Sequence, residues 1–261
     1  MSQHIARKRF GQHFLHDRHY IEHIVNAFHP MADQHIVEIG PGLGVLTREL
    51  MARATHLHAV ELDRDLTARL QQELGPTGQL TLHQADALNF DFCQLVPAGE
   101  KLRIIGNLPY NISTPILFHL LDQVGCIGDM LFMLQKEVVD RMCAPPGGRD
   151  YGRLSVMLQV RCQVESLFDV PPGAFTPPPK VDSAVVRLTP HAQPPVALRD
   201  PQRFAAVVKA AFAQRRKVLR NTLKGMVSAD TMQSLGIDPG RRAETLSLGE
   251  FAALANAYIP A

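Results

Sequence analysis

Four residues that follow a short apolar segment carry the groups needed to hold the amino group of a nucleobase: Asn107, Leu108, Pro109 and Tyr110. The Asn107 side-chain carbonyl and the Leu108 peptide can accept the two N–H bonds of an exocyclic amine, because Pro109 fixes the turn. The Tyr110 ring can stack on the base, which is worth roughly 1 to 3 kcal/mol. Methylation of such a nitrogen depends mainly on geometry, since its lone pair must point at the donor methyl group. A plain strand-to-helix turn would give the same residue types.

A glycine-rich segment, VEIGPGLGVLT (37–47), follows another apolar stretch, and its small residues let a ligand approach the backbone. Its glycines, Gly40, Gly42 and Gly44, are spaced G-x-G-x-G, and the acidic Glu38 lies two residues before the first of them. This spacing differs from the G-x-G-x-x-G of dinucleotide-binding proteins, and the lysine of a P-loop does not follow. Alone, the segment is a weak indication of a nucleotide-type ligand.

Two further acidic residues lie at the ends of the next two apolar stretches. Glu61, in VELD, comes 17 residues after Gly44 and is placed to accept hydrogen bonds from both hydroxyls of a ribose. Asp86, in QADAL, can accept from the exocyclic amine of an adenine. Each could instead be a helix N-cap or a loop residue, but together they favour a nucleoside cofactor, either NAD or S-adenosylmethionine. The amine-binding group at Asn107 favours S-adenosylmethionine, because hydride transfer has no evident use for it.

The charge is unevenly distributed, although the net charge is only +2. Residues 24–182 hold 12 Lys and Arg against 18 Asp and Glu, whereas residues 183–261 hold 11 against 5. Residues 201–229 contain no carboxylate, and a phosphate backbone is the natural counter-charge of such a basic run. We therefore expect nucleic-acid contacts in the C-terminal region, above all from Arg215, Arg216, Lys217 and Arg220.

The length and composition limit the number of domains and the class of protein. The 261 residues, 46% of them hydrophobic, suffice for one large domain and a small one, and no apolar run is long enough to span a bilayer. The segment MSQHIARKRF lacks the apolar core of a secretory signal, so we expect a cytoplasmic protein with no membrane partner. The four cysteines are scattered and are expected to be reduced thiols. The histidines lack a carboxylate or thiolate framework, and we expect no metal.

The elements that position these residues alternate between strand and helix patterns. We predict strands at 35–39, 56–62, 79–83, 102–105 and 130–134, with helices at 44–52, 65–74 and 115–122. This alternation predicts an α/β fold with an open, doubly wound parallel sheet and helices on both faces. Ligands bind such sheets outside the carboxyl ends of the strands, where the strand order reverses, and the candidate residues lie at those ends.

The composition changes after the predicted sheet. Strands at 164–170 and 184–188 flank the proline-rich PPGAFTPPPK and should form an antiparallel hairpin at the edge. The segment HAQPPVALRD, from His191, resembles a linker, and helices are predicted at 204–212, 217–225 and 248–257. The predicted domains are therefore 1–190, with a basic N-terminal arm at 1–23, and a helical C-terminal domain at 191–261.

Six ordered motifs resemble those of the ribosomal RNA adenine N6,N6-dimethyltransferases, most closely the bacterial small-subunit type. They are GQHFL (11–15), EIGPGLG (38–44), VELD (60–63), QADAL (84–88), GNLPY (106–110) and FTPPPKVDSAVVRL (175–188). The resemblance implies a class I S-adenosylmethionine-dependent methyltransferase fold, Rossmann-like, with a small helical domain that binds RNA. It also implies the substrate: two adjacent adenosines in the 3′-terminal hairpin loop of small-subunit (16S) rRNA, dimethylated in immature 30S particles during ribosome biogenesis. The cofactor product would be S-adenosylhomocysteine.

The same resemblance implies roles for individual residues. His13 and Leu15 would line the cofactor from the N-terminal arm, and Gly40 would pass beneath its methionine part. Glu61 and Asp86 keep the roles given above, and Asn107 would lie between the cofactor and the target. Tyr110 and Phe175 would hold the flipped-out adenine between two rings. His13 departs from the pattern, since many relatives have Asn at this place.

Three other functions stay open. A DNA adenine methyltransferase would need a larger target-recognition region than about 70 C-terminal residues provide. A large-subunit rRNA adenine dimethyltransferase of the macrolide-resistance type shares the motif order. A non-catalytic ribosome-assembly factor would not need the intact acidic residues and Asn107. We expect a monomer, because the sequence gives no sign of an obligate oligomer.

Overall fold

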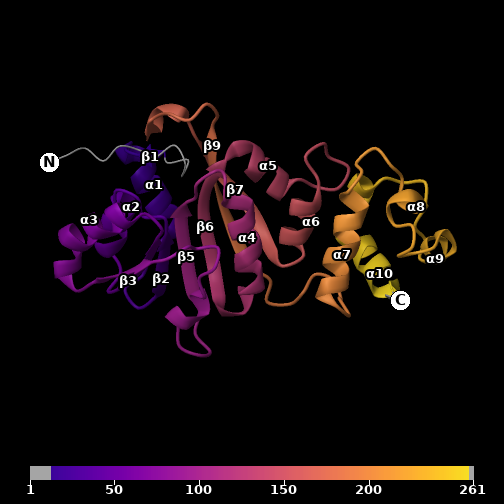
Figure 1. The fold of residues 1–261 in the computed structure, drawn as a ribbon, viewed down its shortest axis with the longest axis horizontal. Helices are drawn as coiled ribbons and strands as arrows, with labels where there is room; N and C mark the ends of the chain where they lie inside the picture. The colour runs from indigo at the N-terminus through magenta and orange to yellow at the C-terminus, as the bar shows by residue number, and fades with distance from the viewer. Residues whose placement is uncertain (1–12, 259–261) are drawn as a thin grey trace. The chain divides into compact units, whose positions relative to one another are not determined.

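The computed structural model describes residues 13–258. Residues 1–12 of the predicted N-terminal arm, with Gly11 and Gln12 of the GQHFL motif, lie outside the described residues. The described chain forms a sheet with strand order β4-β3-β2-β5-β6-β9-β7 and a small sheet of β1 and β8 (Figure 1). The strands are β1 (Phe14–Leu15), β2 (His35–Ile39), β3 (Leu57–Glu61), β4 (Leu80–Gln84), β5 (Leu102–Asn107), β6 (Ile127–Gln135), β7 (Cys162–Val170), β8 (Phe175–Thr176) and β9 (Ser183–Pro190). The α-helices are α1 (Arg18–Phe28), α2 (Val45–Met51), α3 (Arg64–Leu74), α4 (Ser113–Asp122), α5 (Lys136–Cys143), α6 (Arg153–Gln159), α7 (Pro201–Phe212), α8 (Leu219–Thr222), α9 (Ala229–Ser234) and α10 (Leu248–Ala257).

The order of the parallel strands determines where a ligand can bind. Strands β2 to β6 pair in parallel, which confirms the predicted doubly wound sheet. The chain runs outward from β2 through β3 to β4 and then returns to place β5 on the other side of β2. The strand order therefore reverses between β2 and β5, whose carboxyl ends are Ile39 and Asn107.

The sheet is covered on both faces, which is why its central strands are apolar throughout. On one face, α1 and α2 share a hydrophobic cluster with the strands, built from Ile24, Leu50, Ile36, Leu57 and Ile105 among others. On the other face, Ile104 and Phe132 are fully buried, and Figure 1 shows α4 in front of the central strands. Among the described residues, no helix is long and apolar enough to cross a bilayer.

The last two strands of the sheet, β9 and β7, lie beyond β6. Strand β9 pairs antiparallel with β6, with Val186 opposite Phe132, and β7 is the edge strand next to β9. The proline-rich segment between them contributes β8, in which Phe175 pairs with Leu15 of β1. This pairing fastens the first described residues of the chain to the loop before β9.

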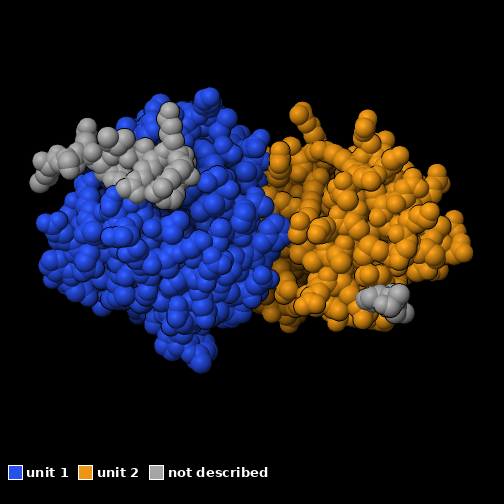
Figure 2. Space-filling view, in the orientation of Figure 1, with its two compact units in different colours: residues 1–139, 165–190 blue, residues 140–164, 191–261 orange. Residues whose placement is uncertain are grey.

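Contacts within the chain define two compact units (Figure 2): unit 1 comprises Met1–Val139 and Glu165–Pro190, and unit 2 comprises Asp140–Val164 and His191–Ala261. The predicted border after residue 190 is one of the borders between them, but the predicted first domain is too large. Residues 140–164 belong to unit 2, because Tyr151, Val156 and Val160 pack in the same hydrophobic cluster as Phe204 of α7 and Phe251 of α10.

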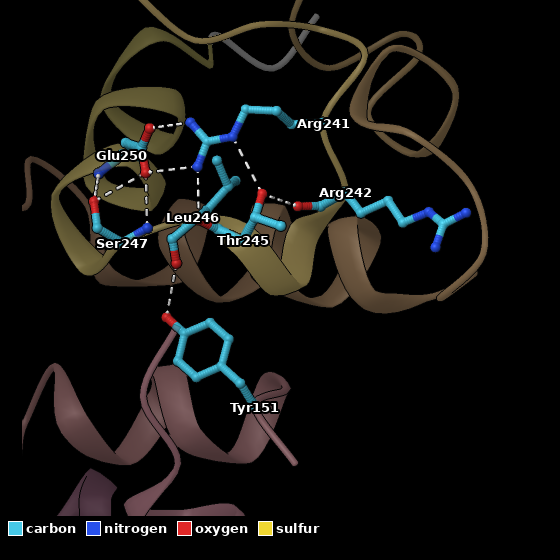
Figure 3. Close-up of polar contacts among 7 residues, drawn as sticks. All are labelled: Tyr151, Arg241, Arg242, Thr245, Leu246, Ser247 and Glu250. Carbon is cyan, nitrogen blue, oxygen red and sulfur yellow. Dashed lines mark hydrogen bonds and ion pairs between the residues drawn. The ribbon is translucent and has the colours of Figure 1, made fainter. Parts of the chain in front are cut away.

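A polar network stabilises unit 2 around the start of α10 (Figure 3). Glu250 completes a capping box with Ser247, and its carboxylate also binds the guanidinium of Arg241. Burial of the Glu250 carboxyl works against ionisation, but the hydrogen bonds from Arg241 and Ser247 outweigh it and lower the pKa of Glu250. The Tyr151 hydroxyl donates to the Leu246 carbonyl at 3.0 Å, and burial, followed by the charge of Glu250, raises the pKa of Tyr151 to about 12.

The predicted helix at 217–225 is mostly wrong. Only α8, Leu219–Thr222, is helical, and residues 213–217 form turns. The backbone N–H groups of Leu219 and Arg220 donate to the carbonyls of Arg241 and Pro239, which anchors this segment to a distant part of the chain. At the other end, Gly225 adopts a φ of 82°, which stops a helix.

The expectation of four reduced cysteines is also wrong. Cys93 and Cys126 form a disulfide across a sequence separation of 33 residues, while Cys162 is a buried thiol. The pair is brought together by packing between two short 3-10 turns, where the Gln123 side chain accepts from the Phe92 N–H at 2.7 Å. Contacts of this kind leave no pattern in the local sequence, so the cysteine spacing could not reveal them.

Candidate active site

A cavity of about 150 Å³ lies at the point where the strand order reverses. The ends of β2, β3 and β5, the loop after β4 and the first described residues of the chain form its walls. Of the predicted catalytic and cofactor residues, its lining includes His13, Leu15, Glu38, Gly40, Gly42, Glu61, Asp86, Asn107, Leu108, Pro109 and Tyr110. The structure thus brings together residues from five separate segments, four of which follow the carboxyl ends of parallel strands.

The glycine-rich loop after β2 forms one wall and needs its glycines. Gly40 and Gly42 have φ values of 68° and 56°, in the left-handed region that favours glycine. A Cβ atom at Gly42 would lie 3.3 Å from the ring of Phe14, so the backbone here is in close contact with β1. The loop therefore keeps its backbone open to the cavity on one side and packed against the N-terminal strand on the other.

Glu38 is a buried carboxyl group at the floor of the cavity. It is 1% exposed, and its Oε2 atom has no hydrogen-bond partner. Burial raises the pKa of Glu38 to about 8; the Thr47 hydroxyl opposes this shift and the charge of Glu61 adds to it. A buried carboxyl oxygen without a partner is costly, so this site is suited to a ligand that brings an N–H or O–H donor.

Glu61 occupies the end of β3, as predicted, and is held in place by backbone groups. It accepts hydrogen bonds from the N–H groups of Asp63, at 2.9 Å, and Gly42, at 3.2 Å. Burial raises the pKa of the Glu61 carboxyl, and these backbone bonds partly oppose the rise. The bond to Gly42 joins the acidic residue to the glycine-rich loop, so two predicted cofactor-binding elements share one rigid arrangement.

Asp86 was predicted either to bind a ligand amine or to be a helix N-cap or loop residue. It lines the cavity, but it also stabilises its own loop, since its two oxygens accept from the Leu88 N–H at 2.9 Å and from Asn89 Nδ2 at 3.0 Å. Each carboxylate oxygen has a second lone pair and can accept another bond. The turn therefore orients Asp86 without using up its capacity to bind a ligand amine.

Asn107 ends β5, and its amide has a defined orientation. Its Nδ2 donates to the His13 carbonyl at 3.1 Å, which leaves the Oδ1 acceptor available on the other side of the amide. The main chain then turns sharply: the Leu108 N–H donates to Met133 of β6, and the Ile112 N–H donates to the Pro109 carbonyl. The expected amide acceptor is thus present and is fixed by a contact that spans 94 residues of sequence.

Tyr110 is held in the same cavity by its neighbours. Its ring stacks on the His13 ring, with centroids 5.5 Å apart and an interplanar angle of 29°. Its hydroxyl hydrogen-bonds with the Ser183 hydroxyl at 2.7 Å, and the Ser113 hydroxyl donates to its backbone carbonyl. Burial raises the pKa of the Tyr110 phenol, and the bond to Ser183 partly opposes the rise. The His13 ring therefore covers one face of the Tyr110 ring.

The family model described as "Ribosomal RNA adenine dimethylase" matches residues 3–259. The chain belongs to this ribosomal RNA adenine dimethylase family. A family relative from Thiobacillus denitrificans, described as "Ribosomal RNA small subunit methyltransferase A", is 59% identical over 256 residues and is covered over 98% of both chains. A relative from Pseudomonas aeruginosa with the same description is 56% identical over 254 residues, with 97% of this chain and 95% of the relative covered.

Two solved structures share the fold of this dimethylase chain. A dimethyladenosine transferase from Plasmodium falciparum matches with a TM-score of 0.78 and 24% identity, over 93% of this chain and 96% of that one. The 23S rRNA methyltransferase ErmE matches with a TM-score of 0.72 and 26% identity, over 94% and 99%. The predicted Rossmann-like methyltransferase fold is confirmed, and so is the prediction of an rRNA adenine dimethyltransferase.

Phe175 does not lie where the resemblance to the dimethylases predicted. It is 3% exposed, belongs to the hydrophobic cluster that contains Leu15, and is absent from the cavity lining. Its pairing with Leu15 in the small sheet directs the ring into the core. Phe175 is therefore not among the predicted site residues that the structure brings together around the cavity.

Several residues near the site were not predicted, among them Phe14, Leu62 and Ser183. Phe14 lines the cavity from within the GQHFL motif, and Leu62, directly after Glu61, lines it with half of its surface exposed. Both lie beside residues that had been selected, so the neighbouring motif was an available signal. Ser183 is buried and contacts Tyr110 across 73 residues, and only the structure reveals it.

The four basic residues expected to bind RNA all lie in unit 2 and are exposed. Arg215 is neutralised in part, because its Nε lies 3.1 Å from Glu244 Oε2 and it also donates to the Arg149 carbonyl. No described residue forms an ion pair with the other three, which are Arg216, Lys217 and Arg220. Within residues 13–258 there is also no group of three or more His, Cys, Asp or Glu side chains that could hold a metal ion.

Proposed function

We propose that this dimethylase transfers methyl groups from S-adenosylmethionine to N6 of two adjacent adenosines in the 3′-terminal hairpin loop of 16S rRNA. The proposal is supported by relatives at 56% and 59% identity that are described as small-subunit methyltransferases, against 26% for the large-subunit enzyme ErmE. It is carried by one geometric observation: the Asn107 amide is oriented by the His13 carbonyl, with its acceptor oxygen available in the cavity that Tyr110 also lines.

The cavity residues suit an adenosine-containing cofactor. The Glu61 carboxylate would accept from the ribose hydroxyls, and Asp86 would accept from the adenine amine with its remaining lone pairs. Glu38 offers its unpartnered oxygen to a donor such as the amino group of the methionine part, above the open backbone of Gly40 and Gly42. His13 and Leu15 would close the cavity from the N-terminal side. When bound, S-adenosylmethionine supplies a methyl group on a positively charged sulfur and leaves as S-adenosylhomocysteine.

The chain's own contribution to methyl transfer is to orient the amine. Asn107 Oδ1 and the Leu108 carbonyl would accept the two N–H bonds of the adenine amine, which turns the nitrogen lone pair toward the donor. Tyr110 would stack on the base with the face that His13 leaves open. Because a methylated amine nitrogen can release its proton to solvent, the mechanism requires no general base.

The RNA partner fits the charge of unit 2. Arg216, Lys217 and Arg220 would bind phosphates and so position the RNA without reading its sequence. A hairpin loop is a suitable target, since flipping a base out of a loop costs less than flipping it out of a duplex. We propose a monomer that acts in the cytoplasm on immature 30S particles.

The test is to incubate the purified protein with labelled S-adenosylmethionine and either immature 30S particles or large-subunit RNA. We expect N6,N6-dimethyladenosine at two adjacent positions of the 16S rRNA. Labelling of large-subunit RNA alone would support the macrolide-resistance type of activity instead. Labelling of neither RNA would contradict the proposed function.

A further inference from the structure

Ser183 is a buried hydroxyl group whose partner is the tyrosine proposed to bind the target base. It is 0% exposed, and its Oγ lies 2.7 Å from the Tyr110 hydroxyl oxygen. A buried hydroxyl without a partner is unfavourable, so this hydrogen bond explains why a serine is tolerated at the start of an apolar strand.

The position of Ser183 is rigid. It pairs with Gln135 in the antiparallel ladder between β9 and β6, and the neighbouring Asp182 carbonyl accepts from the Lys136 N–H at 2.9 Å. The residues that follow it in β9 are buried core residues, from Ala184 to Val186. The hydroxyl of Ser183 is therefore a fixed point relative to the sheet that carries Asn107.

Tyr110, in contrast, lies in the turn between β5 and α4 and has to be fixed by its side-chain contacts. Its backbone carbonyl is bound by Ser113, its ring stacks on His13, and its hydroxyl is bound by Ser183. Stacking on a base requires only the ring, since the π face of phenylalanine serves equally well. Stacking therefore does not need the Tyr110 hydroxyl, and this hydroxyl forms a hydrogen bond with Ser183.

We propose that Ser183 is a positioning residue, whose hydrogen bond to Tyr110 holds the aromatic ring in the plane that stacks on the target adenine. The inference rests on the proposed function, because it assumes that Tyr110 binds the base. Ser183 itself touches neither the cofactor nor the base, since it is absent from the cavity lining and acts through Tyr110.

A double-mutant cycle tests this proposal. Tyr110→Phe and Ser183→Ala each remove the same hydrogen bond, so each should lower the single-turnover rate of methyl transfer to 30S particles by about tenfold, as small misplacements of reacting groups do. The double variant should be no slower than the slower single variant, because the bond can be lost only once. The Kd for S-adenosylmethionine should stay within about twofold of the unaltered protein. Ser183→Thr, which keeps the hydroxyl, should recover most of the rate.

Unit 2 offers matched controls. Tyr151→Phe removes a buried tyrosine hydroxyl that donates to the Leu246 carbonyl (Figure 3), and Ser155→Ala removes a fully buried serine hydroxyl that donates to the Arg141 carbonyl. Both changes match the test variants chemically and lie outside the cavity lining. They should lower the thermal midpoint while leaving the single-turnover rate of the folded protein within about twofold.

The outcomes separate the two proposals. If Tyr110→Phe keeps the full rate, or if the two single effects multiply in the double variant, Ser183 does not position Tyr110. Should Ser183→Ala fold poorly, Tyr110→Phe compared with Tyr151→Phe still decides the question. Should the unaltered protein fail to methylate 16S rRNA at all, the proposed function itself fails, before any variant is compared.

Discussion

The orientation of one amide group matters most for methyl transfer. Asn107 is not simply an acceptor at the end of a strand, because its Nδ2 is already committed to the His13 carbonyl and so determines which way the oxygen points. The backbone of the N-terminal segment thereby sets the geometry of the residue that receives the target amine. Removal of the Asn107 amide should therefore affect chemistry far more than cofactor binding.

We predict that Asn107→Ala lowers the single-turnover rate of methyl transfer by about 100-fold, the magnitude typical for loss of one preorganised hydrogen-bonding group in an active site. The Kd for S-adenosylmethionine, measured by calorimetry, should change by less than about threefold. Asn26→Ala is a suitable control, since Asn26 is an exposed amide that accepts from Arg53. An equal loss of cofactor affinity and rate would assign Asn107 to cofactor binding alone.

Glu38 gives the stability of the protein a predictable pH dependence. Its folded-state pKa of about 8 lies above the ordinary value of 4.5, so between these values the folded state binds more protons than the unfolded state. Stability from this group is complete below about pH 4.5 and is lost as the pH rises toward 8. The slope is at most about 1.4 kcal/mol per pH unit.

Replacing this carboxyl by a neutral amide should remove that slope. We expect Glu38→Gln to gain stability relative to the unaltered protein as the pH is raised from 5 to 8, measured by urea unfolding without cofactor. Glu165→Gln, which changes an exposed carboxylate, should leave the pH dependence unaltered. If the difference between Glu38→Gln and the unaltered protein is the same at both pH values, Glu38 is already ionised in the folded protein.

At the scale of the elements, Arg103 ties the end of α1 to the sheet. Arg103 of β5 binds both oxygens of Asp129 of β6 at 2.6 and 2.8 Å and donates to the carbonyls of Phe28 and His29 at the end of α1. Its guanidinium also lies over the Phe28 ring, 4.3 Å from the centroid. The side chains of Arg103 and Asp129 are only 17% and 16% exposed, so their attraction is poorly screened by solvent.

We predict that Arg103→Ala lowers the free energy of unfolding by about 2 kcal/mol, because it leaves Asp129 and the last carbonyls of α1 without their donor. The comparison is Arg69→Ala, which breaks the exposed ion pair with Glu73 and should cost less than about 0.5 kcal/mol. Chemical denaturation of both variants measures the difference. Equal effects would mean that Arg103 contributes no more to stability than an exposed ion pair does.

Local patterns in the sequence explain which elements could be predicted. The parallel strands were predictable because each contains a short apolar run, and helical patterns separate most of these runs. Helix α1 was missed, although Asp17 caps its first turn and its buried residues recur at helical spacing: Ile21, Ile24, Val25 and Phe28. The basic run was wrongly predicted as helix because its backbone N–H groups bind a distant segment.

In the candidate site, too, local patterns could be predicted from the sequence, whereas contacts between distant segments could not. Most of the predicted site residues that line the cavity could be predicted from pattern, since they lie at the ends of strands in a parallel sheet, whereas His13 and Leu15 followed from the resemblance to the dimethylases. The contacts that orient them could not, because they join His13 to Asn107 and Ser183 to Tyr110 across long stretches of sequence. Phe175 is absent from the cavity lining for a related reason, as it pairs with Leu15 and belongs to the same hydrophobic cluster.

At the scale of the whole molecule, the cavity and the basic residues lie in different compact units. Unit 1 contains the complete cavity, and unit 2 carries the four basic residues proposed to bind RNA. Arg215 is paired with Glu244. We therefore expect the RNA phosphates to be bound mainly by Arg216, Lys217 and Arg220, whose side chains are exposed to solvent. Electrostatic binding of this kind releases counterions, so it can be recognised by its dependence on salt.

We predict that the triple variant Arg216→Ala, Lys217→Ala and Arg220→Ala weakens binding to immature 30S particles and lowers the slope of log K against log salt by about 2 to 3, close to one for each lost phosphate contact. Methyl transfer at saturating RNA and the Kd for S-adenosylmethionine should stay within about threefold, since unit 1 contains the cavity. The control removes three exposed arginines of unit 1: Arg18, Arg53 and Arg64. This control should leave the slope unchanged. Equal slopes for the triple variant and the unaltered protein would exclude these three residues from the RNA-binding surface.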